Sequence, residues 1–444
     1  MKRLLAVLTL MVLTASGAWA ATYTLLPVNA NTNWYHPIWD IGSYPKAADD
    51  VAVISNANVS SPTTSLSISL GMSITVGVIR TAGTTTNVPW VTISSDSGSV
   101  LYFQSSDGRA VVEAAGMNAG SWQLHLNSRM TLLSDLEARC VSNKIFMFGS
   151  GAYDIAGASN LYLRNLAIGS GSYGTFDTRM PASPNFTGEL HLEGRPYVSV
   201  GHDAANNRYI MTNALVIVEP GTALLLRSYV SNLGYRVVCR SGSTLQAHVN
   251  QPANFRTPVE IHGWVTNTVW AGGYAFNLRG DVSGTGTIFR LGQWARMTNC
   301  YVGSVSPGLS GPGTITFMSS LAAGGTTSAW ANALLLGEAG DPLQLVIEDG
   351  DQVIVTNRGE VLNLALLDVT FLTTTLQGTT NWFLQSGDGF AGGAFNSVDW
   401  GIFNGYCVSN VAGMENYIGA VVVPEPALLL LLGLCGLVAS RFRG

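Results

Sequence analysis

One strand-like segment near the middle of the chain holds its most suggestive group of ionisable residues. Only 11% of the residues are charged, yet Glu189, His191 and Glu193 alternate with Leu190 and Leu192. Alternate side chains of a β-strand share one face, so we expect the three ionisable groups outward and the two leucines in the core. Carboxylates two residues apart, at ~6.5–7 Å, suit a metal ion or a general acid–base pair. The alternative, which we prefer, is the solvated face of an amphipathic strand.

Other motifs receive structural interpretations. The acidic run Glu348-Asp349-Gly350-Asp351 lacks the spacing of an EF-hand loop. Its Asp-Gly pair predicts a hairpin-type turn, with a loosely bound calcium ion as the alternative. No C-x-x-C motif and no Cys/His cluster indicates zinc. We therefore predict no resident metal.

Nucleotide binding and the usual hydrolase motifs are not indicated. Gly-x-Gly-x-x-Gly begins at Gly169 and again at Gly387, but 50 glycines in 444 residues produce such matches by chance. Neither match is followed by the helical pattern that a phosphate site needs. A Gly-x-Ser-x-Gly elbow, a His-Glu-x-x-His motif and a P-loop are all missing from the sequence. We predict no cofactor and no enzyme, with Glu189, His191 and Glu193 as the only candidates for catalysis.

Composition predicts the elements that would position these side chains. The chain has three lysines and many Gly, Ser, Thr and Asn residues, which favours strands joined by tight turns over helices. A net charge of −5 offers no basic patch for nucleic acid. Cys140, Cys239, Cys300 and Cys407 are too scattered for a disulfide framework, although one or two bridges are open to them.

Repetition predicts a solenoid. Residues 217–225 match residues 238–246 as strand, turn, glycine, small hydroxyl residue and strand. The glycines Gly221, Gly242 and Gly263 are 21 residues apart. A period of 20–25 residues without heptads predicts a right-handed parallel β-helix over residues 21–300, and a β-sandwich is the alternative.

Aromatic residues stand at the start of the body and within it. Trp34 and Trp39 precede the run 50–54, Asp-Val-Ala-Val-Ile, and the order resembles the N-terminal cap of exported bacterial β-solenoid proteins. An end coil has no neighbour, so we expect both rings to cover it, with a carbohydrate-stacking platform as the alternative. Trp264 and Trp270 suggest a sugar-binding patch, but we expect core or cap packing.

Both ends of the chain resemble targeting signals. A basic start, an apolar run and Ala18-Trp19-Ala20 predict a secretory signal peptide at residues 1–20. Near the other end, Pro424-Glu425-Pro426 precedes an uncharged apolar run at 427–440 and then Arg441 and Arg443. That order resembles the PEP-CTERM sorting signal, which an exosortase recognises and cleaves. The tail has only two arginines, and an ordinary C-terminal anchor is the alternative.

Residues 301–420 complete the predicted organisation. A Ser-Pro-Gly turn at 306–308, a Gly-Thr-Ile-Thr strand at 313–316 and an apolar strand before Gly350 resemble the C-terminal part of autotransporter-like, PEP-CTERM-tailed β-solenoids. The resemblance implies an exported passenger-type protein and no reaction. We assign 1–20 to the signal peptide, 21–300 to the solenoid, 301–420 to a C-terminal β region and 421–444 to sorting.

Taken together, the sequence predicts an exported, non-enzymatic surface or extracellular-matrix β-solenoid. Its expected partners are the secretion machinery, an exosortase, the inner membrane during transient anchoring with the C-terminus in the cytoplasm, and extracellular polysaccharide. The alternatives are a carbohydrate-binding adhesin and a polysaccharide lyase or hydrolase built on a β-helix.

Overall fold

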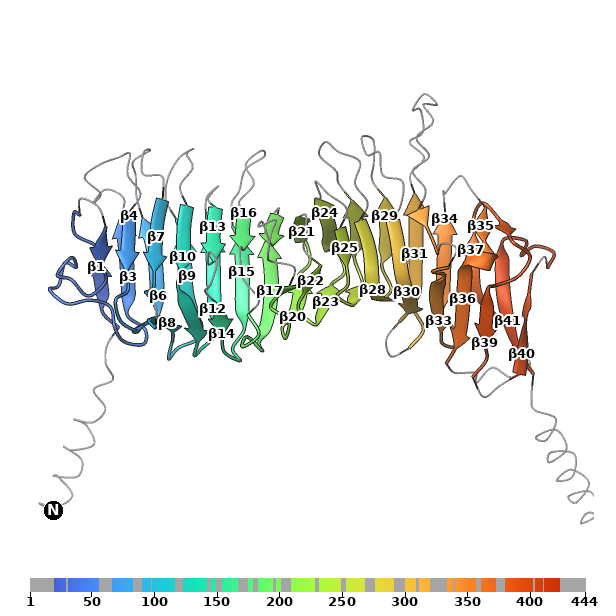
Figure 1. The fold of residues 1–444 in the computed structure, drawn as a ribbon, viewed down its shortest axis with the longest axis horizontal. Coiled ribbons are helices and arrows are strands. Elements are labelled where there is room, and N and C mark those ends of the chain that lie inside the picture. Colours follow the sequence, from blue (N-terminus) through green and yellow to red (C-terminus); the bar gives the residue numbers. More distant parts are fainter. Residues whose placement is uncertain are drawn as a thin grey trace, which may run out of the picture. The chain divides into compact units, whose positions relative to one another are not determined.

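The fold is all-β, with long parallel sheets of the kind that a β-solenoid forms, as the composition and the repeat predict (Figure 1). The structure is a computed structural model. It describes residues 20–423 except 29–30, 56–65, 83–89, 97, 116–122, 142–144, 149–153, 167–174, 179–182, 195–196, 201–208, 228–230, 249–252, 268–275, 291–299, 309–310, 320–333, 338–339, 357–360, 373–379, 402–403 and 410. Of the two predicted cleavage-site residues, Ala20 begins this range and Ala18 lies outside it. The sorting residues 424–444 also lie outside it.

The chain forms two compact units. Unit 1 comprises Met1–Ser199 with Met211–Ala214, and unit 2 comprises Val200–Ile210 with Leu215–Gly444. Parallel pairing runs through unit 2 across residue 300, the predicted boundary between the solenoid and the C-terminal β region. Pairing between neighbouring coils therefore continues from one predicted region into the next.

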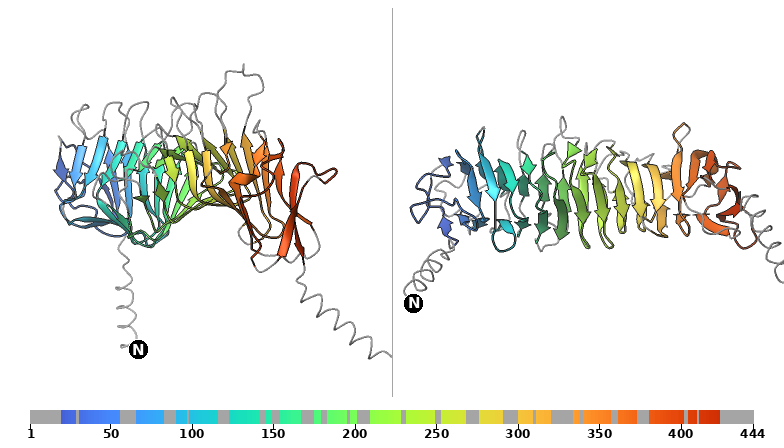
Figure 2. Two further views of the ribbon diagram at one scale, coloured as in Figure 1. Left: turned by 45° about the vertical axis from the view of Figure 1, so that its right-hand side comes forward. Right: turned by 90° about the horizontal axis from the view of Figure 1, so that it is seen from below.

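Unit 1 winds around three walls of parallel strands, which the chain visits in turn (Figures 1 and 2). The first wall holds β1 (Thr22–Thr24), β3 (Val51–Ser55), β6 (Val78–Ala82), β9 (Ala110–Ala114), β12 (Leu136–Cys140), β15 (Leu161–Asn165) and β17 (Glu189–Gly194). The second wall holds β2 (Thr32–Asn33), β4 (Leu66–Ser69), β7 (Trp90–Ser94), β10 (Gln123–Asn127), β13 (Ile145–Phe148) and β16 (Thr175–Thr178). The third wall holds β5 (Ile74–Val76), β8 (Val100–Phe103), β11 (Arg129–Leu132) and β14 (Ile155–Ala156), and β18 (Tyr197–Val200) follows β17.

Successive strands of the first wall in unit 1 alternate inward apolar and outward residues in the same register. The inward side chains of neighbouring coils therefore form rows of aliphatic groups in the core. One inward row of the first wall is formed by successive register partners that are all fully buried: Ala52, Ile79, Val112, Ala138, Leu163 and Leu192. Neighbouring members lie one strand spacing apart, ~4.8 Å. Burial of each Ile, Val or Leu side chain of the row contributes ~1.5–3 kcal/mol, so the row fixes the register of the outward face as well.

The two tryptophans near the start of the body are buried, as we expect for rings that cover an end coil. Trp34 and Trp39 are 0% and 1% exposed. Their indole N–H groups donate to the carbonyl oxygens of Pro45 and Trp34. Buried rings cannot stack on a sugar, so the alternative of a carbohydrate platform at these two residues is wrong.

Unit 2 is also built of parallel strands stacked coil upon coil. One wall holds β20 (Leu215–Val218), β23 (Arg236–Cys239), β26 (Val259–Ile261), β28 (Phe276–Gly284), β30 (Cys300–Pro307), β33 (Leu343–Ile347), β36 (Leu367–Phe371) and β39 (Ser397–Asp399). A second wall holds β21 (Ala223–Arg227), β24 (Thr244–His248), β27 (Trp264–Asn267), β29 (Thr287–Arg290), β31 (Thr314–Ser319), β34 (Gln352–Thr356), β37 (Thr380–Ser386), β41 (Tyr417–Val423) and β40 (Asn404–Val408). Shorter elements are β19 (Tyr209–Ile210), β22 (Asn232–Leu233), β25 (Ala253–Phe255), β32 (Leu334–Leu335), β35 (Leu362–Asn363), the 3₁₀ turn η2 (Leu364–Leu366) and β38 (Phe390–Ala391).

The predicted sequence repeat is one coil of unit 2. Ile217 pairs with Val238 and Leu225 with Gln246, an advance of 21 residues in both walls. Gly221 and Gly242 occupy equivalent corners with φ of 76° and 79°, a backbone conformation that favours glycine. The parallel pairing excludes the β-sandwich alternative.

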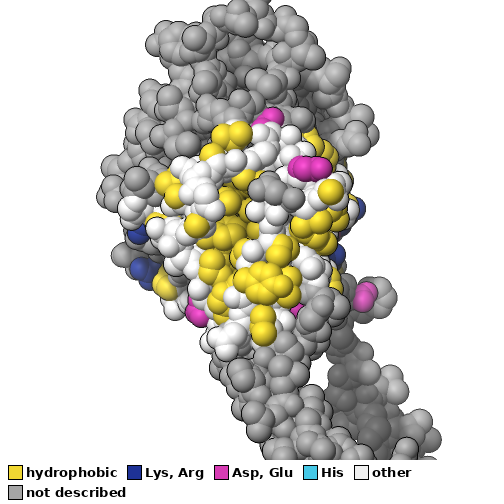
Figure 3. Space-filling view, turned by 90° about the vertical axis from the view of Figure 1, so that its right-hand side faces the viewer, with side chains coloured by type: hydrophobic (Ala, Val, Ile, Leu, Met, Phe, Trp, Pro, Cys, Tyr) yellow, Lys and Arg dark blue, Asp and Glu magenta, His cyan; other side chains and the backbone are white. Residues whose placement is uncertain are grey.

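An antiparallel arrangement ends the stack. β41 pairs antiparallel with both β37 and β40, whereas the earlier pairs of this wall are parallel. The Trp400 ring stacks on Phe371 with centroids 4.6 Å apart. Figure 3 looks onto this end and shows hydrophobic side chains gathered there. Tyr406 of β40 and Val423 of β41 are exposed.

Candidate functional site

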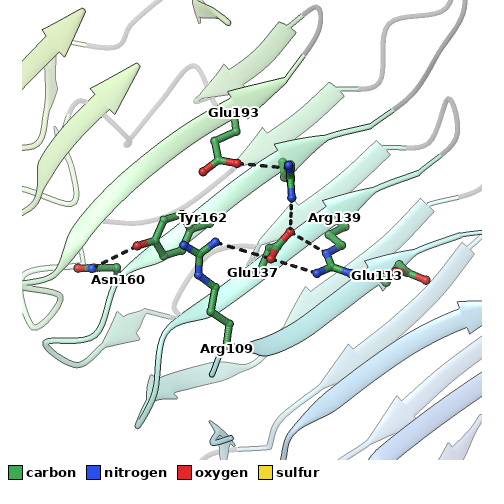
Figure 4. A network of polar contacts seen from close by, with 8 residues as sticks. Arg109, Glu113, Glu137, Arg139, Asn160, Tyr162 and Glu193 are labelled. Atoms are coloured by element: carbon green, nitrogen blue, oxygen red, sulfur yellow. Dashed lines mark hydrogen bonds and ion pairs between the residues drawn. The ribbon is translucent and has the colours of Figure 1, made fainter. Parts of the chain in front are cut away.

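Two rows of polar side chains cross the outward face of the first wall in unit 1. In-register pairing places the same strand position of consecutive coils side by side. The first row consists of the successive partners Arg80, Glu113, Arg139, Arg164 and Glu193. The second row lies two residues earlier in each strand and contains Glu137, Tyr162 and His191. Figure 4 shows Glu137 of the second row facing Arg139 of the first row, with Arg109 and Tyr162 beside them.

Glu137 lies at the centre of these rows. Its carboxylate is 2.7 Å from Arg139 Nε, 3.3 Å from Arg164 Nη1 and 3.7 Å from Arg109 Nη1. Only 6% of the Glu137 side chain is exposed, against 32–44% for the three arginines that cover it. Burial alone would raise the pKa of this carboxyl, but hydrogen bonds and attraction from Arg139 and Arg164 outweigh it and hold the pKa below its ordinary value. Glu137 is therefore ionised at neutral pH.

Further ion pairs extend the network along the first row. Glu113 accepts from Arg80 at 3.0 Å and lies 3.6 Å from Arg139, so it joins the coils on either side of it. Glu193 lies 3.4 Å from Arg164. The hydrogen bond to Glu137 raises the pKa of Arg139. We call the set Arg80, Arg109, Glu113, Glu137, Arg139, Arg164 and Glu193 the charge ladder.

A column of planar groups adjoins the charge ladder. The Arg109 guanidinium lies 3.4 Å from the centre of the Tyr162 ring, a cation–π contact. The Tyr162 and His191 rings stack with centroids 4.5 Å apart and planes 14° apart. His191 Nε2 is 2.9 Å from Glu189 Oε2. Tyr162 and His191 are each only 9% exposed, so the column packs against the wall and extends little into solvent.

The predicted catalytic candidates do not form one group. Leu190 and Leu192 are buried as the alternation predicts. Glu189 pairs with His191, but Glu193 pairs with Arg164 of the neighbouring coil. Each of the three ionisable side chains thus has a charged or stacked partner. Across the described ranges, no group of three or more His, Cys, Asp or Glu side chains could hold a metal ion.

The acidic turn is not the predicted hairpin. β33 pairs with β30 and β36, whereas β34 pairs with β31 and β37, so the turn is a corner between two walls. Asp351 is fully buried there and accepts hydrogen bonds from the N–H groups of Gly313 and Glu348. Burial raises the pKa of its carboxyl to about 6, although those two N–H groups act in the opposite direction. The Asp side chain closes a corner and has no exposed surface for calcium.

Asp351 should make the stability of unit 2 depend on pH. Its folded-state pKa lies above the ordinary value of 3.8, so its contribution is full at pH below about 4 and is lost as the pH rises through about 6. We expect the free energy of unfolding to fall by up to ~3 kcal/mol over that range. Asp351→Asn should remove this pH dependence and Asp349→Asn should retain most of it, as urea unfolding between pH 4 and 8 would show. Identical pH profiles for Asp351→Asn and the parent chain would contradict the assignment.

Three cysteines lie among the residues whose side chains the structure describes. Cys140, Cys239 and Cys407 form no disulfide there, so none of them makes the bridge that the sequence left open. Burial raises the pKa of Cys239 to about 12 and that of Cys407 to about 11. A thiol is nucleophilic only as the thiolate, so these two side chains are packing residues.

A second polar cluster lies at a corner of unit 2, between β26 and β27. Arg236 Nη2 is 2.5 Å from Glu260 Oε2, and Glu260 Oε1 is 2.7 Å from His262 Nε2. His262 Nδ1 is 3.0 Å from Thr285 Oγ1. The sequence alone assigns no candidate role to His262. The spacing of Glu260, His262 and Trp264 at alternate positions was the signal that could have found the cluster.

Trp264 corrects another prediction, because it lies neither in the core nor in a cap. It is the first residue of β27, and 45% of its surface is exposed. Gly263 before it is tightly packed, since a Cβ there would meet the carbonyl oxygen of Ser243 at 2.2 Å. The chain thus turns the corner at Gly263, and the indole is exposed on the outward face. Trp270 lies outside the described residues.

The fold and the sites define an all-β, parallel solenoid whose outward charges pair from coil to coil. No family model, curated protein or solved structure matches the chain. No helix in the part of the chain that the structure describes is long and apolar enough to cross a membrane.

Proposed function

We propose that the protein is an exported, non-enzymatic β-solenoid of the cell surface or extracellular matrix. A signal peptide ending at Ala20 directs secretion, the coils wind right-handed, and an exosortase cleaves at the Pro424-Glu425-Pro426 segment after transient anchoring in the inner membrane. The handedness rests on the strong right-handed preference of parallel crossover connections. The targeting steps rest on the two terminal motifs.

The charge ladder carries the non-enzymatic part of this proposal. A general acid or base works best when its pKa lies near the working pH. The pKa of Glu137 is instead shifted downward and that of Arg139 upward, so both stay charged at neutral pH. The groups stabilise one another across coils, which suits a scaffold that must resist unwinding.

Sorting is tested by mass spectrometry of the protein purified from its native host. We expect the mature chain to begin at Ala21 and to lack residues beyond the Pro424-Glu425-Pro426 segment. A variant with all three motif residues replaced by alanine should not be cleaved and should keep the apolar run 427–440. A variant with an unrelated substitution, such as Asp349→Asn, should be cleaved like the parent chain. A parent chain that still ends at Gly444 would refute the exosortase step.

The absence of catalysis is tested at the predicted candidates. The parent chain should release no product from polysaccharide preparations of the native host, as reducing-end and uronate assays would show. The variants Glu189→Ala and His191→Ala should behave in the same way. Turnover by the parent chain that either substitution abolishes would replace the structural proposal by the lyase or hydrolase alternative.

A further inference from the structure

An exposed indole lies within a row of hydroxyl groups on the outward face of unit 2. Thr244, Trp264, Thr287 and Thr316 are register partners in consecutive coils. Each is separated from the next by one strand spacing, ~4.8 Å. The row contains no charged residue, and the threonines are half-buried while Trp264 is exposed. The row therefore offers an apolar plate with hydroxyl groups on both sides along the coil axis.

The polar cluster at the same corner is held in a fixed arrangement. Glu260 accepts hydrogen bonds only, so His262 Nε2 carries the hydrogen of their 2.7 Å contact. In the neutral ring, Nδ1 then accepts from the Thr285 hydroxyl at 3.0 Å. Arg236 neutralises Glu260. The result is a set of donors and acceptors with no net charge when His262 is neutral, on side chains that are between 18% and 35% exposed for Arg236, Glu260 and His262.

We propose that this corner, formed by His262, Trp264 and Thr285, binds a neutral polysaccharide. A pyranose ring has an apolar C–H face that packs on an indole, and hydroxyl groups at its edge that can donate to the hydroxyl oxygen of Thr285 and the carboxylate of Glu260. His262 holds these two groups in place, because both of its ring nitrogens are engaged by them. The uncharged threonine row allows the polymer to extend along the coils without a charge requirement. This ligand adds to the proposed function and does not depend on export or on C-terminal sorting.

The same cluster also has the connectivity of an acyl-transfer triad, in which Thr285 would be the nucleophile and His262 the base. The backbone around it argues against that chemistry. The N–H of Thr285 donates to Ile261 and the N–H of Thr287 donates to Gly263, so neither is directed at a developing oxyanion. Exposure of Trp264 is also better explained by binding, because a triad does not require it.

Affinity electrophoresis of the full chain tests the proposal. Native gels would contain soluble β-glucan, xyloglucan, galactomannan or dextran, and alginate would be the anionic comparison. We expect retardation by at least one neutral polymer and none by alginate. Trp264→Ala should weaken the affinity about tenfold or more, Trp264→Phe should retain most of it, and Thr285→Val should weaken it about two- to fivefold.

The matched control is Tyr406→Ala, which removes another exposed aromatic ring, on β40, and should migrate like the parent chain. Circular dichroism checks that each variant is folded. No retardation in any neutral gel, or equal retardation of Trp264→Ala and the parent, overturns the proposal. Hydrolysis of p-nitrophenyl acetate that Thr285→Val abolishes would also overturn it, in favour of acyl transfer. None of these results bears on whether the protein is exported, because that is read from its mature termini.

Discussion

Replacing Glu137 by Gln should lower the free energy of unfolding of the coils around β12 and β15 by ~3 kcal/mol at pH 7. The substitution keeps the size of the side chain but removes the negative charge between Arg109, Arg139 and Arg164. Three guanidinium groups then face one another across neighbouring coils without their common partner. Urea unfolding of the full chain, with hydrogen exchange of peptides from β12 and β15, would measure the loss.

The pH dependence distinguishes charge pairing from packing. The folded-state pKa of Glu137 lies below its ordinary value of 4.5, so its stabilisation is present above that pH and is lost as the pH falls through the folded-state pKa. The parent and Glu137→Gln should therefore converge in acid. Glu193→Gln is the matched control, because Glu193 is 25% exposed and pairs with Arg164 in this network; we expect only ~0.5 kcal/mol. A deficit that persists unchanged in acid would show that packing, and not charge, stabilises these coils.

The sequence predicts the coils better than it predicts the contacts between them. Residues 217–225 and 238–246 match because their corners need glycines with positive φ and their strands need alternating apolar residues, both of which are local requirements. The inward position of Leu190 and Leu192 follows from the same alternation. Such features are encoded within a few residues of chain and can be read without a structure.

The charge ladder depends on coil lengths that vary. The strand register places Arg80 beside Glu113, 33 residues later in the chain. It places Arg139 beside Arg164 after 25 residues, and Arg164 beside Glu193 after 29. A search at one fixed period cannot align these positions, so the sequence groups Glu193 with Glu189 and His191 and does not indicate its partner Arg164. Insertions at the corners change the spacing along the sequence but leave the register of the walls intact.

The sequence of the acidic turn fits a hairpin as well as a solenoid corner for a related reason. Asp349-Gly350 places Gly350 at a φ of 84°, and both a hairpin and a solenoid corner use that conformation. The distinction lies in the partners of the flanking strands, which are separated by whole coils. Buried Asp351 shows the consequence, because its carboxylate joins Glu348 to Gly313 in the preceding coil.

At the opposite end of the chain, Asp50→Ala should open the N-terminal cap and cost ~3–5 kcal/mol, because it leaves three backbone donors without their acceptor. The Asp50 carboxylate is 4% exposed and accepts from the N–H groups of Ala21, Lys46 and Ala47. In the proposed mature chain the donor at Ala21 becomes an α-ammonium group, and its 3.2 Å contact gains an opposite charge.

Opening of the cap in Asp50→Ala can be measured by trypsin cleavage of one peptide bond, the bond after Lys46. Lys46 is held by Asp50, so trypsin should cleave after Lys46 much faster in Asp50→Ala than in the parent. Asp40→Ala is the matched control, because Asp40 is exposed and accepts from the N–H of Thr24 at 2.9 Å; we expect ~1 kcal/mol and little change in cleavage. Loss of the cap also uncovers the edge of β1, which should promote association of the variant on size-exclusion chromatography. If Asp50→Ala elutes like the parent and resists trypsin as the parent does, the buried tryptophans Trp34 and Trp39 alone hold the cap closed.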